Sequence, residues 1–252
     1  MIKIRKVSVF IVTILSLMYF NKPALAFSNN TVEGINILMY HSVGYAENNG
    51  LIMKPEEFRK QIQYIKENSY TVLTLNELYE IFNKNLPIPE KSVVITFDDG
   101  YADNYKYAYP ILKEFEIKAT IFVIADTIDE DNNYLNSQQI KELQNNGIDI
   151  QDHTCQHIEL DKLTYEKQLE TLNKSKEYLE KLLNKKVNYI SYPYGKYNED
   201  TIKAVKDAGY LMGFTTKEKA AKKSNGVYTI YRRYINSLDE FSVFISKLKN
   251  TT

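Results

Sequence analysis

The segment Ser92-Val93-Val94-Ile95-Thr96-Phe97-Asp98-Asp99-Gly100 joins a short apolar run to a polar turn. The run at 92–97 is apolar enough to form a buried β-strand, whereas Asp-Asp-Gly is a common turn sequence that needs no function. Two ionised carboxylates at the mouth of a buried strand repel each other unless a cation or a proton lies close to them. A metal ion on Asp99 would remove this repulsion and leave Asp98 free to act as a base.

Short β-branched runs of the same kind alternate with longer helical patterns from Ile35 onward. This alternation is typical of a parallel α/β sheet or barrel. Helices are expected at 55–68, which opens with a proline, and at 165–183, where leucines form one stripe. We therefore predict a distorted (β/α) barrel of seven to eight parallel strands, slightly smaller than the roughly 250 residues of a regular barrel. The expected strands are 35–41, 70–74, 92–97, 119–124, 148–153, 187–192, 211–215 and 228–235.

The first residues of the chain have the pattern of a secretory signal. Three basic residues precede an apolar run at 7–20, and Pro23-Ala24-Leu25-Ala26 follows it. Small residues of the Ala-x-Ala type mark a cleavage site, so we expect a signal peptide at 1–26. The apolar run is shorter than the roughly 18 to 20 residues that cross a bilayer, so an uncleaved membrane anchor is the less favoured alternative. Residues 27–252 are then one exported domain, secreted or held at the cell surface.

Composition excludes several classes of protein. With 44% hydrophobic and 25% charged residues, the chain fits one globular domain with a sizeable core. Without 1–26 it carries 28 basic and 32 acidic residues, and this net charge of −4 argues against a nucleic-acid partner, which calls for a basic face. Cys155 is the single cysteine, so no internal disulfide is possible. Its offset of two from His153 directs it away from the histidines, and we interpret it as an apolar filler.

All three histidines of the chain, His41, His153 and His157, can be assigned to one site with Asp98 and Asp99. Their segments lie at the carboxyl ends of predicted strands, where β/α barrels place their working groups. His153 and His157 are four residues apart, a spacing that puts both imidazoles on one side of a helical turn, as in several zinc sites. Two imidazoles and one carboxylate make a facial metal triad. Taken alone, the histidine pair could instead be two polar loop residues.

Three motifs together resemble the polysaccharide deacetylase family, also called carbohydrate esterase family 4 or the NodB homology domain. They are Thr96-Phe97-Asp98-Asp99-Gly100, then His153-Thr154-x-x-His157, then Tyr192-Pro193-Tyr194-Gly195. Their order and spacing are specific, and the resemblance spans most of the mature chain. It implies a NodB-like barrel.

The same resemblance assigns roles to individual residues. It implies that Asp98 is the general base and that Asp99, His153 and His157 hold a divalent metal, commonly Zn²⁺, with Co²⁺ or Ni²⁺ as other options. The backbone amide of Tyr194 would bind the oxyanion of the tetrahedral intermediate. Tyr192, Pro193 and Tyr194 would form the substrate-binding motif, with the tyrosine rings stacking on a sugar.

Two departures from the family pattern concern the missing arginine and the missing late histidine. Where the family has Arg-x-Pro-Tyr, this chain has Ser191-Tyr192-Pro193-Tyr194, and no histidine follows His157. His41, in Met39-Tyr40-His41-Ser42, resembles the start of the branch that deacetylates poly-N-acetylglucosamine, where the last motif has moved to the N-terminus. We therefore expect His41 to be the general acid. By position alone, Arg232 and Arg233 are candidates to replace the missing arginine.

The sequence thus predicts an exported, metal-dependent deacetylase that hydrolyses N-acetyl groups of an N-acetylglucosamine polymer. Its partner would be an acetylated amino-sugar polysaccharide, with poly-β-1,6-N-acetylglucosamine preferred. Three alternatives remain open: a peptidoglycan N-acetylglucosamine deacetylase, an O-acetyl xylan esterase, or a catalytically silent domain that binds metal and glycan. The presence of Asp98 argues against the silent domain, because binding alone needs no base.

Overall fold

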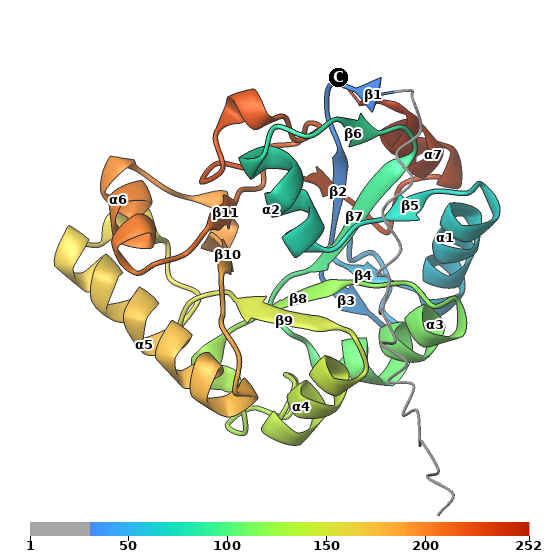
Figure 1. The fold of residues 1–252 in the computed structure, drawn as a ribbon. Helices are drawn as coiled ribbons and strands as arrows, with labels where there is room; N and C mark the ends of the chain where they lie inside the picture. The colour runs from blue at the N-terminus through green and yellow to red at the C-terminus, as the bar shows by residue number, and fades with distance from the viewer. Residues whose placement is uncertain (1–30, 252) are drawn as a thin grey trace, which may run out of the picture.

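The computed structural model describes residues 31–251, which form a curled parallel sheet with helices around it (Figure 1). The sheet has the order β11-β10-β9-β8-β7-β2-β12, and β5 also pairs with β7. The predicted signal peptide at 1–26 lies outside the described residues and stays a prediction. The strands of the sheet are β2 (Asn36–Tyr40), β5 (Thr71–Val72), β7 (Ser92–Phe97), β8 (Thr120–Val123), β9 (Asp149–Asp152), β10 (Tyr189–Ser191), β11 (Met212–Phe214) and β12 (Arg233–Tyr234).

Each of these strands lies within one of the predicted ranges, so the predicted α/β barrel class is confirmed. The expected helices at 55–68 and 165–183 are also present, as α1 and α5. Four very short strands, β1 (Thr31–Val32), β3 (Ser42–Val43), β4 (Ile52–Met53) and β6 (Ile88–Pro89), form two small additional ladders. The helices are α1 (Pro55–Glu67), α2 (Leu75–Asn83), α3 (Tyr109–Glu114), α4 (Ser137–Asn145), α5 (Tyr165–Leu183), α6 (Glu199–Asp207) and α7 (Phe241–Lys249).

The central strands are buried on both faces. Every residue of β2 and β7 is buried, which explains why their sequences are continuous apolar runs rather than alternating patterns. Helices cover the outside of the sheet (Figure 1). In the leucine stripe of α5, Leu172 and Leu179 are fully buried. That stripe is therefore core packing.

The two ends of the sheet are joined by one short segment, 230–234. Its first residue, Ile230, bridges Phe214 of β11, and the Thr215 amide donates to the Ile230 carbonyl at 2.8 Å. Its last residues form β12, which pairs with β2 through Arg233 and Tyr234. Because so few residues make both contacts, the barrel is distorted and only narrowly closed. Beyond this segment the chain returns to the amino end of β2, where the Asn36 side chain donates to the Leu248 carbonyl at 3.0 Å.

Since the strands are parallel, their carboxyl ends meet at one rim of the barrel. β2 is followed by His41, β7 by Asp98, β9 by His153, and β10 ends at Ser191. The fold thus gathers side chains separated by up to 150 residues of sequence at one place. Across residues 31–251, no helix combines the length and apolarity that a membrane span requires.

Candidate metal centre and catalytic cleft

Asp99, His153 and His157 converge as predicted. Their ligand atoms all lie within 4.8 Å of one another, and Oδ1 of Asp99 lies 3.3 Å from Nε2 of each histidine. Four tetrahedral ligands about 2.0 to 2.1 Å from a zinc ion are about 3.3 to 3.4 Å apart, so the observed spacing suits such an ion. The geometry fits a small divalent metal without selecting one.

His153 is oriented for metal binding by a hydrogen bond on the far side of its ring. Its Nδ1 lies 2.7 Å from the Ser191 carbonyl oxygen. A carbonyl only accepts, so Nδ1 carries the proton and Nε2 presents its lone pair to Asp99 and His157. Nε2 of His153 is buried and has no hydrogen-bond partner among the described residues. A metal at the triad would supply the missing partner, so the residues present fit such an ion.

The histidine pair does not lie on a helical turn, and that expectation is corrected. Residues 153–157 form an irregular loop after β9, with positive φ at Thr154 (69°) and His157 (55°). The His157 amide donates to the Thr154 hydroxyl at 3.2 Å, and the two imidazoles lie 4.8 Å apart between centroids. Left-handed backbone turns, rather than a helical turn, therefore bring the two imidazoles together.

Positive φ values recur around the triad, at Asp99 (71°) and Tyr194 (57°) as well as in the histidine loop. Such conformations cost non-glycine residues of order 1–3 kcal/mol each and tend to gather at functional sites. Gly100 follows Asp99 with φ of 77°, and a Cβ there would lie 2.9 Å from the side chain of Val123. The Asp-Asp-Gly turn therefore requires its glycine for both space and conformation.

Asp98 is held by a buried arginine from the closing segment of the barrel. Arg232 donates from its two terminal nitrogens to the two carboxylate oxygens of Asp98, at 2.7 and 2.6 Å. Their side chains are 0% and 4% exposed, respectively. Burial alone would raise the pKa of Asp98, but the charges of Arg232 and His153 hold it below its ordinary value. Asp98 is thus an oriented carboxylate that stays ionised.

Of the two arginines suggested by position, only Arg232 takes this place. Arg233 points elsewhere and donates to the Asn36 side chain at 3.1 Å and to the Asn250 carbonyl at 2.9 Å. Ser191, which stands where the family has arginine, joins the network: it accepts from Arg232 at 2.8 Å and donates to Asp98 at 3.2 Å. The small serine leaves room for the arginine that arrives from the other end of the chain.

His41 lines the same cleft as Asp98 and Asp99. Its Nδ1 is buried without a hydrogen-bond partner in the described chain, and its ring meets Tyr234 edge-on at 6.0 Å. Burial lowers the pKa of His41, against the opposing pull of the two aspartates. The structure therefore brings His41 to the site, while its role as the acid stays a prediction.

Tyr192 and Pro193 are buried, which corrects their assignment as substrate-binding residues. Tyr192 is 0% exposed, donates to the Tyr228 carbonyl at 2.9 Å, and stacks on Tyr197. Its neighbour Tyr194 is 58% exposed and packs against His157 with centroids 4.5 Å apart. Only Tyr194 of this motif lines the cleft, so it alone can contact a ligand there.

The cleft has a volume of about 510 Å³, a size typical of ligand sites. Beyond the predicted residues it is lined by Tyr101 and Tyr134, whose rings stack at 5.2 Å. Sequence reasoning also missed Asp103, which accepts from the Ser42 hydroxyl and from the Val43 amide and so anchors the segment after His41. No sequence signal distinguished these residues from the many other tyrosines and aspartates.

Comparisons with known proteins agree with this geometry. The family profile described as "Polysaccharide deacetylase" matches residues 85–213. A Bacillus subtilis protein named "Putative polysaccharide deacetylase YxkH" is 38% identical over 216 residues, covering 84% of this chain and 76% of the relative. Staphylococcus aureus "Poly-beta-1,6-N-acetyl-D-glucosamine N-deacetylase" is 32% identical over 247 residues, covering 92% and 84%.

Among solved structures, "Streptococcus pyogenes deacetylase PplD in complex with acetate" superposes with a TM-score of 0.82 at 33% identity. The match covers 87% of this chain and 99% of that one, and it confirms the NodB-like distorted barrel. The profile, the relatives and the Asp-His-His triad point to one conclusion. The chain belongs to the polysaccharide deacetylase family, as a metal-dependent hydrolase of carbon–nitrogen bonds.

Proposed function

We propose that this protein is an exported N-deacetylase that removes acetyl groups from N-acetylglucosamine units of a polysaccharide, with the β-1,6-linked polymer as its preferred substrate. The observation that carries the proposal is an ionised carboxylate, Asp98, fixed by Arg232 beside a complete metal triad. A binding domain has no need of that second carboxylate. The buried ion pair therefore supports catalysis over a silent glycan-binding role.

The reaction consumes one water and one acetamide and yields acetate and a free amine. When bound, the divalent metal supplies a Lewis acid that polarises the acetamide carbonyl and acidifies water. Asp98 takes the proton of the attacking water, and Arg232 keeps its carboxylate aimed. The Tyr194 amide donates to the carbonyl oxygen as negative charge develops there. His41 gives a proton to the leaving nitrogen, which would otherwise be a poor leaving group.

Two observations support the β-1,6-linked polymer. The Staphylococcus aureus relative bears that activity in its name and aligns over 92% of this chain. The acid candidate His41 follows the first strand of the main sheet, and no histidine follows His157. This placement resembles the branch that deacetylates poly-N-acetylglucosamine, in which the last motif has moved to the N-terminus. The predicted signal peptide supports export, since such a polymer lies outside the cell.

The decisive experiment is acetate release by the purified domain from poly-β-1,6-N-acetylglucosamine and from peptidoglycan, with and without added Zn²⁺, Co²⁺ or Ni²⁺. We expect metal-dependent release, faster from the β-1,6-linked polymer. An acetylated xylan serves as the third substrate, because the same site chemistry would permit ester hydrolysis. Faster release from peptidoglycan or xylan would refute the substrate assignment, and full activity after exhaustive chelation would refute the metal-dependent mechanism.

A further inference from the structure

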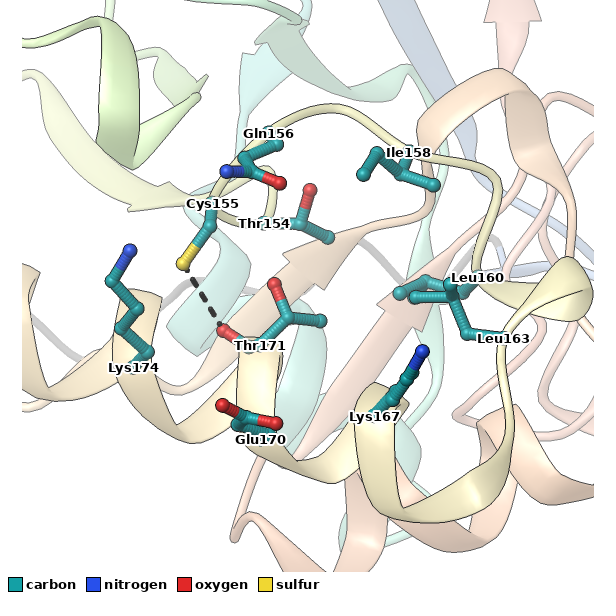
Figure 2. Close-up of a pocket in the computed structure, with 10 residues that line it drawn as sticks. All are labelled: Thr154, Cys155, Gln156, Ile158, Leu160, Leu163, Lys167, Glu170, Thr171 and Lys174. Atoms are coloured by element: carbon teal, nitrogen blue, oxygen red, sulfur yellow. Dashed lines mark hydrogen bonds between the residues drawn. The ribbon is translucent and has the colours of Figure 1, made fainter.

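A second pocket lies directly behind the histidine loop (Figure 2). Its volume is about 280 Å³, and its two walls are the loop at 154–158 and the first turns of α5. This is near the lower limit of roughly 300 Å³ for small-molecule pockets, so it suits one sugar unit rather than an oligosaccharide. The loop bears the metal ligands on its other side.

This pocket adjoins the catalytic cleft. Cys155 and Gln156 line both spaces. Cys155 is 3% exposed and lies 3.4 Å from the Thr171 carbonyl, which ties the loop to α5. Gln156 is exposed and stands on the ridge between the two spaces. A polymer with one unit at the triad therefore has the pocket within reach of its next unit, across Gln156.

The pocket has two chemically distinct ends (Figure 2). Ile158, Leu160 and Leu163 gather at one end, and Ile158 is 44% exposed although it is apolar. Thr171 of α5 and Gln156 of the loop lie at the other end, and Lys167 lies beneath Leu163. A pyranose ring with an acetamide offers the same pairing, because its methyl group is apolar while its hydroxyls form hydrogen bonds.

We propose that this pocket is a subsite for a second N-acetylglucosamine unit of the same polymer, bound while its neighbour is at the triad. The acetamide methyl lies against Ile158 and Leu163, and the hydroxyls contact Thr171, Gln156 and Lys167. The inference rests on the proposed function and deepens it, because the enzyme then selects substrates of at least two units.

Filling the pocket tests the subsite. Thr171→Trp and Lys167→Trp each place an indole in the pocket, the first from a half-buried and the second from an exposed position of α5. Asn173→Trp puts the same side chain at an exposed position of the same helix that does not line the pocket. Each zinc-loaded variant is assayed on a β-1,6-linked N-acetylglucosamine pentamer and on a small activated acetyl ester, which is too short to reach the pocket.

The readout is the ratio of kcat/KM on the pentamer to kcat/KM on the ester. We expect this ratio to fall by about tenfold or more in both filling variants and to change less than about twofold in Asn173→Trp. An equal loss on both substrates would show that the indoles disturb the histidine loop, and an unchanged ratio would show that no sugar binds there; either result overturns the subsite. A wild-type chain that cleaves the ester but leaves the pentamer intact would instead overturn the proposed function.

Discussion

Replacing Arg232 with glutamine should both destabilise the protein and disable its base. Arg232 makes two short hydrogen bonds to Asp98, and both side chains are almost completely buried. Glutamine cannot supply the positive charge, so the carboxylate is left buried without its counter-ion. Breaking such a pair from one side costs about 3–5 kcal/mol of unfolding free energy. Denaturant titration of the metal-free protein measures this loss.

The substitution should also reverse the pH behaviour of Asp98. In the wild type, the pKa of Asp98 is lower in the folded protein than the value of about 3.9 in the unfolded chain. The ionised Asp98 therefore stabilises the fold above a pH of about 3.9, and this stabilisation is lost only as the pH falls through the lower folded pKa. Without Arg232, burial dominates and raises the pKa of Asp98. We therefore expect the acid limb of the kcat/KM profile to move to higher pH in Arg232→Gln.

A double variant and a neighbour provide the controls. Asp98→Asn combined with Arg232→Gln leaves no buried charge, so it should recover part of the stability lost in Arg232→Gln while staying inactive. Arg233→Gln removes hydrogen bonds to Asn36 and Asn250 but strands no carboxylate, and should cost only about 1–3 kcal/mol. Two results would refute this reasoning. One is a loss of unfolding free energy in the double variant that equals the sum of the two single losses, and the other is a loss in Arg233→Gln as large as that in Arg232→Gln.

Three further predictions follow from the site. His153→Ala should lose bound metal together with activity, because two remaining ligands hold the ion poorly; retention of about one ion per chain by elemental analysis would contradict the triad. His41→Ala should keep its metal but lose turnover on acetamides by about 10²-fold or more, and much less on an activated acetyl ester; equal losses on the two substrates would contradict an acid role. Burial raises the pKa of Asp152 to about 6, so this carboxyl binds a proton more tightly in the folded state than in the unfolded chain. The contribution of Asp152 to the free energy of unfolding therefore falls as the pH rises from about 4 to 6. Asp152→Asn should remove about 3 kcal/mol of the difference in unfolding free energy between pH 4 and pH 7, measured by denaturation of the metal-free protein. The same difference in the variant as in the wild type would be evidence against a raised pKa of Asp152.

The strands and the metal triad could be predicted because their signals are local. A continuous β-branched run such as 92–97 indicates a strand buried on both faces, and parallel strands place their carboxyl ends at one rim. Asp98 and Asp99 follow such a run and His153 follows another predicted strand, at 148–153, so the convergence of these residues followed from the fold class. The capping and apolar spacing of α5 likewise lie within one stretch of chain.

Other features depended on packing between distant segments. Arg232 reaches Asp98 across 134 residues of sequence only because the segment at 230–234 closes the barrel, and position alone did not separate it from Arg233. Tyr192 and Tyr194 are two residues apart in one motif, yet the backbone turn at Tyr194 buries one ring and exposes the other. Local sequence determines which conformations a segment favours, whereas burial and pairing depend on neighbours that arrive from elsewhere in the chain. The tertiary structure therefore decided which arginine orients the base and which tyrosine faces the cleft.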